Sequence, residues 1–238
     1  MKTLARESGN NQKFEIQFNA NALKFFSAAG LSASLIVIIC NTTLYSFGDL
    51  GDWPQWALNL SYWAGSIALA FAGIGFIPTY FALRPAGSFW AVSSSGVLAY
   101  FLALGSSGHG SFFAHYSILQ AVHNSPGIQE LETLVLPIQT YNYFLFFSAI
   151  FILFLGSVLY SITVAVRPTL YPRWMALWNP LLIALITIIP GEIEGIPDTV
   201  RILSRGIGFH LGLAGHFMLT YYFLRPYFVE SSPGSSEK

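Results

Sequence analysis

The chain has 238 residues, of which 54% are hydrophobic, 16% are aromatic and only 9% are charged, with a formal net charge of zero. Soluble domains carry about a quarter charged residues, so this composition excludes a large water-soluble domain and predicts a chain surrounded mainly by lipid. There is no basic excess for nucleic acid, and the single cysteine, Cys40, excludes an intrachain disulfide and a cysteine-based metal site.

Six stretches of the chain are apolar enough to cross a membrane as helices. A crossing helix needs about 20 mainly apolar residues. The six stretches cover residues 23–47, 56–83, 89–104, 137–166, 174–190 and 199–224. The sequence therefore predicts an all-α, polytopic membrane protein, with a bundle of six transmembrane helices in a domain of residues 23–228.

The two ends differ from this domain. In residues 1–22, Phe14, Phe18 and Ala22 fall near one helical face between polar residues, which predicts an amphipathic helix on the cytoplasmic membrane surface. No small-residue cleavage site follows the first apolar run, so we expect it to remain as a helix. Residues 229–238 are polar and rich in serine and glycine, which predicts disorder.

The third stretch is followed by a run of small residues, Gly105-Ser106-Ser107-Gly108-His109-Gly110. Glycine and serine are poor helix formers, and apolar character continues through residues 111–122. We expect a break in the helix at this run, followed by a short helix at or dipping into the membrane interface.

Basic residues indicate the orientation, because cytoplasmic loops carry an excess of lysine and arginine. With the N-terminus inside, nine of the 11 lysines and arginines fall on the cytoplasmic side, and only Arg201 and Arg205 fall outside. The sequence therefore predicts a multi-pass protein of the cell membrane with both termini in the cytoplasm.

A short repeat supports the same layout. Residues 79–85, TYFALRP, closely match residues 220–226, TYYFLRP, and the fourth span also ends in Arg167-Pro168. Proline stops a helix, and arginine suits both the helix C-terminus and lipid phosphates. Three helical hairpins in series would give this pattern. The similar sequences would arise either by duplication or by independent selection of the same residues to end a helix.

Polar residues collect in the outer half of the predicted bundle, whereas the inner halves consist of plain leucine, phenylalanine, isoleucine and alanine. Polar groups in hydrocarbon are costly unless they pair or face water, so this gathering predicts a cavity open to the outside. The alternative is that these residues are helix ends at the headgroup level.

The last span carries a stripe of special residues on one helical face: Arg201, Arg205, Gly208, Gly212 and His216. The two glycines, four residues apart, let a neighbouring helix approach closely, so the stripe is expected to face the bundle. The two arginines suit capture of a ligand carboxylate or phosphate group. Salt bridges to Glu192 and Glu194 are the alternative.

These features lead to the hypothesis of an outward-facing polar and histidine pocket that binds or processes a small amphipathic or lipid-like molecule. An enzyme of this kind would be a hydrolase with a histidine or carboxylate as general base. The candidate catalytic residues are His109, His216 and Glu192. The candidate ligand-binding residues are Arg201, Arg205, His115, Glu194, Thr43 and Asn142.

Five histidines also raise zinc as a cofactor. The ligands would be His109, His115, His123 and either Glu192 or Glu194. However, His109 and His115 are six residues apart, as are His210 and His216, so neither pair shares a helix face, and no HxxxH or HExxH motif occurs. We therefore assign no metal ligands. The spacing of six residues between His210 and His216 does not suit a pair of haem ligands on one helix either.

Two resemblances accompany these patterns. Gly105-Ser106-Ser107-Gly108 resembles the segment around the nucleophile of rhomboid intramembrane proteases. Those proteases also have six helices and a histidine on a late helix, to which His210 or His216 would correspond. Their pair of a histidine and an asparagine on the second helix is absent here. Residues 171–180, YPRWMALWNP, together with the six-span layout and the Gly/His-rich last span, resemble uncharacterised bacterial inner-membrane families. The second resemblance implies a bacterial source and no function.

The competing hypothesis is a small-molecule transporter or a non-catalytic structural or accessory subunit. No intramembrane acidic residue suits ion coupling, and inverted repeats are not visible. The expected partners are the lipid bilayer, a lipid-like molecule and, through His210, a second copy of the chain; no nucleic acid is expected.

Overall fold

The computed structural model describes residues 20–47, 53–125, 127–195, 197, 200 and 203–227, and every regular element in them is a helix. The longer α-helices are α1 (Ala20–Tyr45), α3 (Gly65–Ile74), α5 (Ser88–Asn124), α6 (Gln129–Val166) and α9 (Phe209–Leu224). The shorter ones are α2 (Gln55–Asn59), α4 (Ile77–Leu83) and α7 (Pro180–Ile188). Short π- or 3-10-helical segments extend them: η2 (Leu60–Ala64), η3 (Arg84–Ala86), η4 (Arg173–Leu177), η5 (Ile189–Glu192), η6 (Leu203–Gly208) and η7 (Arg225–Tyr227).

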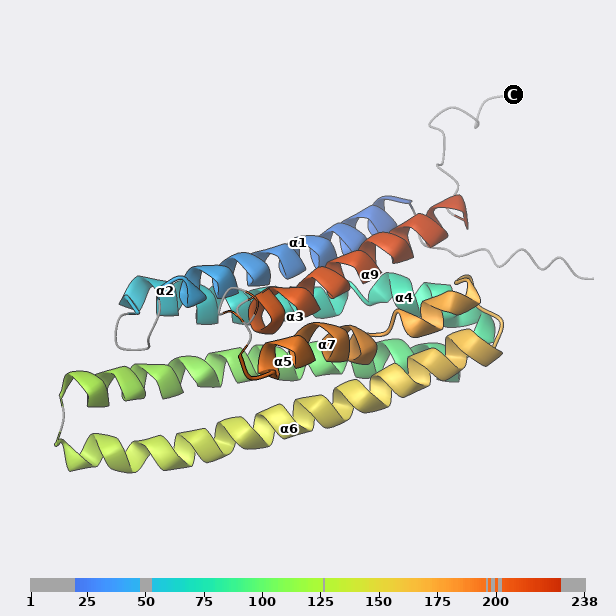
Figure 1. Cartoon of the computed structure of the whole chain (residues 1–238). Coiled ribbons are helices and arrows are strands. Elements are labelled where there is room, and N and C mark those ends of the chain that lie inside the picture. Colours follow the sequence, from blue (N-terminus) through green and yellow to red (C-terminus); the bar gives the residue numbers. More distant parts are fainter. Residues whose placement is uncertain are drawn as a thin grey trace, which may run out of the picture.

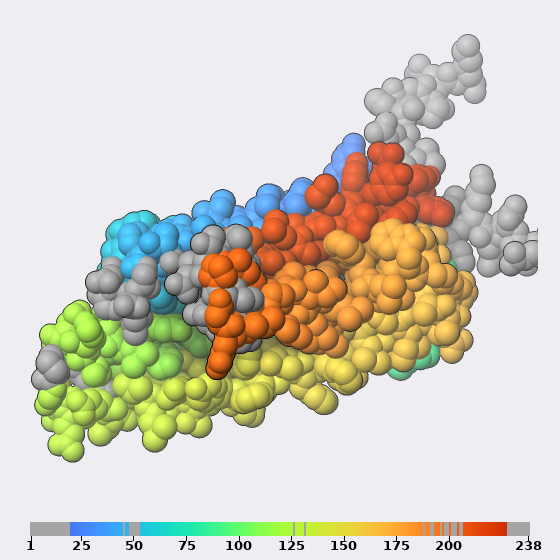
Figure 2. Space-filling view, in the orientation of Figure 1, coloured from blue at the N-terminus to red at the C-terminus, as the bar shows by residue number. Residues whose placement is uncertain are grey.

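The helices lie along one long axis and form an elongated bundle (Figure 1). α1 packs against α3 and α9, α3 packs against α5, and α5 packs along α6. α5 and α6 form a helical hairpin whose tip reaches beyond the other helices at the left of Figure 1. In the space-filling view the green and yellow of this hairpin form the lower-left end of the molecule (Figure 2). We call this the hairpin end.

The opposite end of the bundle, here called the arginine end, holds the C-termini of α4, α6 and α9 (Figure 1). Each is followed at once by an arginine and a proline, at residues 84–85, 167–168 and 225–226. The connections meet there, since the Leu170 N–H donates to the Ala82 carbonyl oxygen over 2.9 Å. Arg173 Nη1 donates to the Val164 carbonyl oxygen over 2.6 Å and so caps the end of α6.

Among the described residues, four helical stretches are long and apolar enough to cross a membrane: residues 20–44, 55–86, 88–124 and 132–166. They correspond to the first four predicted spans. The fifth predicted span folds as η4, a nine-residue α7 and η5, and the described part of the sixth folds as η6 and α9. Several long apolar helices of this kind are compatible with a multi-pass membrane protein.

The predicted helix break at residues 105–110 is wrong, because α5 runs without interruption from Ser88 to Asn124. A Cβ atom at Gly105 or Gly110 would meet α3 only at ordinary contact distances of 3.6 and 3.8 Å. The contact between α5 and α3 comes instead from a hydrogen bond and from a glycine of α3. The Ser106 hydroxyl donates to the Ser66 carbonyl oxygen over 2.7 Å, and a Cβ atom at Gly65 would come within 2.9 Å of His109 Nδ1. This packing outweighs the helix cost of glycine, about 1 kcal/mol per residue.

The glycine pair of the last predicted span also serves helix packing. A Cβ atom at Gly208 would lie 2.5 Å from Thr187 Cβ, and one at Gly212 would overlap Ile183. Both neighbours belong to α7, so the expected close approach of another helix to this face is confirmed. The predictions for residues 1–19 and 228–238 fall outside the described residues.

Two apolar clusters fill the bundle. The larger joins all the long helices and includes Leu98, Tyr160 and Phe217. The smaller lies toward the hairpin end, between the end of α1, α2, η2 and α5. It comprises Leu44, Trp53, Ala57, Leu58 and Tyr62, with Phe47, Phe112, Phe113 and Tyr116 packed against it.

Candidate functional site

The residues predicted for one outward-facing pocket are distributed over separate parts of the bundle. Arg201 lies outside the described residues, as do the side chains of Glu192 and Arg205. Glu194 is exposed in the turn after η5, and Thr43 is half-buried near the end of α1. Ligand capture by the two arginines therefore stays a prediction.

His109 lies where α5 packs against η2 and α3. Its ring stands 6.1 Å from the ring of Tyr62 and occupies the notch left by Gly65. His109 Nδ1 is buried and makes no hydrogen bond to the described residues. His109 is thus turned toward η2 and α3.

His115 and Asn142 belong to a second location, the seam between α5 and α6. The Ser111 hydroxyl donates to Asn142 Oδ1 over 2.5 Å, and His115 lies one turn further on the same face of α5. Asn142 is only 3% exposed, and its Nδ2 makes no hydrogen bond to the described residues. His115 lies about 120° around the helix from His109, so the two histidines do not share a site.

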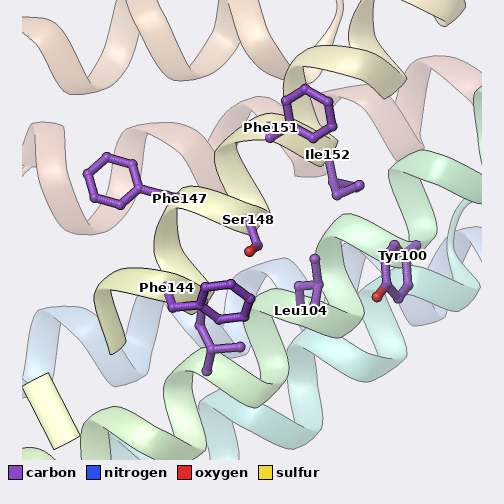
Figure 3. Close-up of a pocket in the computed structure, with 8 residues that line it drawn as sticks. Tyr100, Leu104, Phe144, Phe147, Ser148, Phe151 and Ile152 are labelled. Atoms are coloured by element: carbon purple, nitrogen blue, oxygen red, sulfur yellow. The ribbon is translucent and has the colours of Figure 1, made fainter. Parts of the chain in front are cut away.

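Next to this polar contact, toward the arginine end, the same seam opens into an apolar groove of about 510 Å³ (Figure 3). The groove is lined by Tyr100 and Leu104 of α5 and by Phe144, Leu145, Phe147, Ser148, Phe151 and Ile152 of α6. In Figure 3, Ser148 points from α6 toward Leu104. The rings of Tyr100, Phe144, Phe147 and Phe151 are all more than half exposed, so the groove is open along its side.

Two close contacts between α5 and α6 mark the ends of the groove. Asn142, Leu145 and Ile152 recur at spacings of three and seven residues and so share one face of α6. Gly156 follows on this face, and a Cβ atom there would lie 2.9 Å from Leu98 Cδ2. The helices are therefore in close contact at Gly156 and at Asn142, and the groove lies between these two contacts.

His216 lies in a third location, in the half of the bundle toward the arginine end. The ring is fully buried, and its Nε2 stands 3.1 Å from Thr79 Oγ1. The Tyr171 hydroxyl lies 3.4 Å from Thr79 Oγ1 and 2.7 Å from Thr220 Oγ1. The expectation that His216 faces the bundle is confirmed, whereas the expectation of purely apolar packing in this half is wrong.

Tyr160 of α6 completes this buried polar cluster. Its ring centre lies 5.6 Å from that of His216. The Tyr160 hydroxyl and His216 Nδ1 are both buried, and neither has a hydrogen-bond partner among the described residues. The cluster joins α4, α6, α9 and the connection that precedes η4.

Sequence reasoning missed Tyr160, Tyr171, Thr79 and Thr220. The available signal was the heptapeptide repeat, in which Thr79 and Thr220 occupy the same position. It also missed the groove, whose phenylalanines are typical of an ordinary lipid-facing helix surface.

No group of three or more histidine, cysteine, aspartate or glutamate side chains that could hold a metal ion occurs among the residues that the structure describes. Of the histidines considered as zinc ligands, His109 and His115 face different neighbours, α3 and α6. Zinc therefore has no ligand set in the described part of the chain.

The described fold is that of an all-helical protein with several long apolar helices, a side groove and a buried polar cluster. The chain belongs to a family of unknown function, DUF6796, whose model matches residues 18–224. No curated protein and no solved structure matches the chain. The family description assigns no activity.

Proposed function

We propose that this chain is a membrane protein with six crossings and both termini in the cytoplasm, and that the α5–α6 seam binds a small amphipathic or lipid-like molecule. The observation that carries the proposal is the apolar groove. One turn beyond its lining residue Leu145 on α6, toward the hairpin end, the buried amide nitrogen of Asn142 has no hydrogen-bond partner among the described residues. An apolar chain suits the groove, and a hydrogen-bond acceptor suits the amide.

Exposed aromatic side chains support a position for the bilayer. Trp63, Tyr141 and Tyr143 are exposed toward the hairpin end, and Trp174 and Tyr222 toward the arginine end. Such rings favour the two membrane interfaces. Between Tyr143 and Val166, α6 covers about 35 Å, against a hydrocarbon thickness of about 30 Å. The groove then lies within the lipid and Asn142 at its outer boundary.

The described charges support the orientation. Those toward the arginine end are all basic: Lys24, Arg84, Arg167, Arg173 and Arg225. The acidic residues whose side chains are described, Glu130, Glu132 and Glu194, belong to the hairpin tip and the turn after η5. Basic residues favour the cytoplasmic side, so the arginine end is placed there.

The last two crossings are assigned to η4, α7 and η5 and to η6 with α9. η6 and α9 have six and 16 residues and follow one another directly, so together they cover about 33 Å. α7 is short, but η4 and η5 extend it on both sides. The close contact of Gly208 and Gly212 with α7 supports an antiparallel helix pair.

The described groups favour binding over chemistry. The open side of the groove gives a lipid-like molecule lateral access from the bilayer, and the donor at Asn142 favours a carboxylate, phosphate, carbonyl or hydroxyl oxygen. Hydrolysis would require a general base beside the groove, and the predicted bases His109 and His216 lie elsewhere. The proposal is therefore a binding site, with hydrolysis left out of it.

Photo-crosslinking with a diazirine-bearing palmitic acid tests the proposal on the full-length protein in phospholipid vesicles. We expect cross-links to concentrate on residues 100–104 and 144–152. Ser148→Phe fills the groove and should reduce this labelling several-fold. Thr140→Phe, at an exposed position two turns away on α6, is the matched control and should leave it unchanged.

Evenly distributed cross-links would overturn the proposal. If all exposed lipid-facing residues were labelled alike, and Ser148→Phe had no more effect than Thr140→Phe, the groove would hold only the ordinary annular lipid that surrounds any membrane protein.

A further inference from the structure

A chain of hydrogen bonds runs through the half of the bundle toward the arginine end. It connects Thr220 to Tyr171 over 2.7 Å, Tyr171 to Thr79 over 3.4 Å, and Thr79 to His216 Nε2 over 3.1 Å. Three of these side chains are fully buried, and Tyr171 is 4% exposed. Thr220 lies little more than one helical turn from Arg225, so one end of the chain is near the arginine end.

The contacts allow a chain that runs in one direction, from Thr220 to His216. In the contact between Tyr171 and Thr220 either hydroxyl can donate. Where the Tyr171 hydroxyl donates to Thr79 Oγ1, Thr220 is the donor to Tyr171, because a tyrosine has only one hydroxyl proton. Thr79 then has its own proton free for His216 Nε2. The neutral His216 ring therefore accepts at Nε2 and carries its proton on Nδ1.

The environment of the ring comes from several elements. The rings of Phe76, Tyr160 and Phe217 lie 5.4, 5.6 and 5.9 Å away, and the Trp178 carbonyl group lies beside the histidine. Tyr160 from α6 is a titratable group whose ring faces His216, and Tyr171, from the connection before η4, contacts Thr79. The other side chains described against the ring are Thr79, Phe76 and Phe217, which do not titrate.

We propose that His216 is a proton-binding site inside the bundle, and that protons reach it from the arginine end through Thr220, Tyr171 and Thr79. An ionisable side chain within a membrane span is costly and is typically retained for function, proton relays among others. The proposal uses no residue of the α5–α6 groove, so it stands or falls independently of lipid binding.

The transfer involves only O–H and N–H bonds. Thr220 is fully buried, so the transfer begins when a hydrated proton from the arginine end reaches it. This proton binds to the Thr220 hydroxyl oxygen, and the proton of that hydroxyl moves to Tyr171. The Tyr171 proton moves to Thr79, and the Thr79 proton moves to His216 Nε2. The product is an imidazolium cation with a proton on each nitrogen, and release to the arginine end reverses the same steps.

Nitrogen NMR of the full-length protein, labelled with ¹⁵N-histidine in lipid nanodiscs, tests the proposal. The His216 signals are assigned by their loss in His216→Gln. We expect the neutral ring to carry its proton on Nδ1, and acidification to protonate Nε2. Thr79→Val and Tyr171→Phe remove a hydroxyl from the chain and should each slow proton exchange between His216 and water by about tenfold or more.

Two control variants separate relay from packing. Thr79→Ser retains the hydroxyl and should exchange like the wild type, whereas Thr79→Val retains the shape. Tyr160→Phe removes a hydroxyl outside the chain and should leave exchange unchanged. Equal exchange rates in the serine and valine variants, or a resting ring with its proton on Nε2, would overturn the proposal. The comparison of Thr79→Ser with Thr79→Val tests the relay even if the Tyr171→Phe variant does not fold.

Discussion

Thr79 of α4 and Thr220 of α9 both contact the hydroxyl oxygen of Tyr171, over 3.4 and 2.7 Å. The two threonines occupy the same position of the repeated heptapeptide, and each lies five residues before an Arg-Pro pair. Both are fully buried. The repeat therefore does more than end two helices, because it places two hydroxyl groups around one tyrosine and joins α4, α9 and the connection between α6 and η4.

Tyr171→Phe should destabilise the fold by removing this shared partner. Thr79 loses its donor and Thr220 loses its acceptor in a buried setting, so we expect the free energy of unfolding to fall by about 1–3 kcal/mol. Denaturant titration in detergent micelles, followed by helical circular dichroism, measures the change. Tyr100→Phe, at a side chain that is 54% exposed, is the control and should change little. Equal stability of the two variants would show that the Tyr171 hydroxyl contributes nothing.

Gly212→Ala tests the close contact between α9 and α7. The added methyl group would overlap Ile183, and overpacking of this kind costs about 1–3 kcal/mol. Gly96→Ala is the matched control, because a Cβ atom at Gly96 in α5 meets nothing within 4 Å and alanine is the better helix former by about 1 kcal/mol. Thermal melting should therefore shift down for Gly212→Ala and up for Gly96→Ala. The same sign for both would contradict the packing described for α7.

The long helices could be predicted because their apolar runs are long enough to override local detail. α5 illustrates the limit of that reasoning, since glycine and serine at residues 105–110 argue locally for a break. The deciding contact, Ser106 to the Ser66 carbonyl, comes from a residue 40 positions earlier. The helix propensity of a short segment takes no account of a hydrogen-bond partner that lies on another helix, far away in the sequence.

Part of the candidate site could be predicted by its level along the bundle, but not by direction around the helices. The gathering of polar residues in the outer halves of the predicted spans put Asn142 and His115 near one level, and the structure puts both on the α5–α6 seam. The same gathering included His109, which faces α3 and not α6. His216 contacts Thr79, which in turn contacts the loop residue Tyr171, and no helical periodicity links a loop to a helix face.

Asn142→Leu should separate chain binding from head-group recognition in the proposed groove. Leucine keeps the volume but removes the amide donor, so we expect binding of a palmitic acid probe to weaken about five- to tenfold, while a probe without an acceptor group binds as before. Ser111 keeps a partner in the Gly108 carbonyl oxygen, over 3.0 Å, so the fold should tolerate the change. Gln139→Leu, one turn away on α6, is the control. An unchanged preference for the acid would exclude Asn142 as the head-group contact.

Cysteine accessibility in intact cells should decide between six crossings and four. Cys40 is buried and is first replaced by serine, and single cysteines are then introduced as Ser88→Cys, Ser125→Cys, Glu194→Cys or Tyr227→Cys, all at exposed positions. An impermeant maleimide should label the Ser125 and Glu194 variants in intact cells, and the Ser88 and Tyr227 variants only after permeabilisation. Glu194→Cys is the decisive variant, because it follows α7 and changes sides only if the short α7 segment crosses the bilayer. Labelling of Ser125→Cys without Glu194→Cys would leave four crossings, and labelling of Ser88→Cys in intact cells would contradict the proposed orientation.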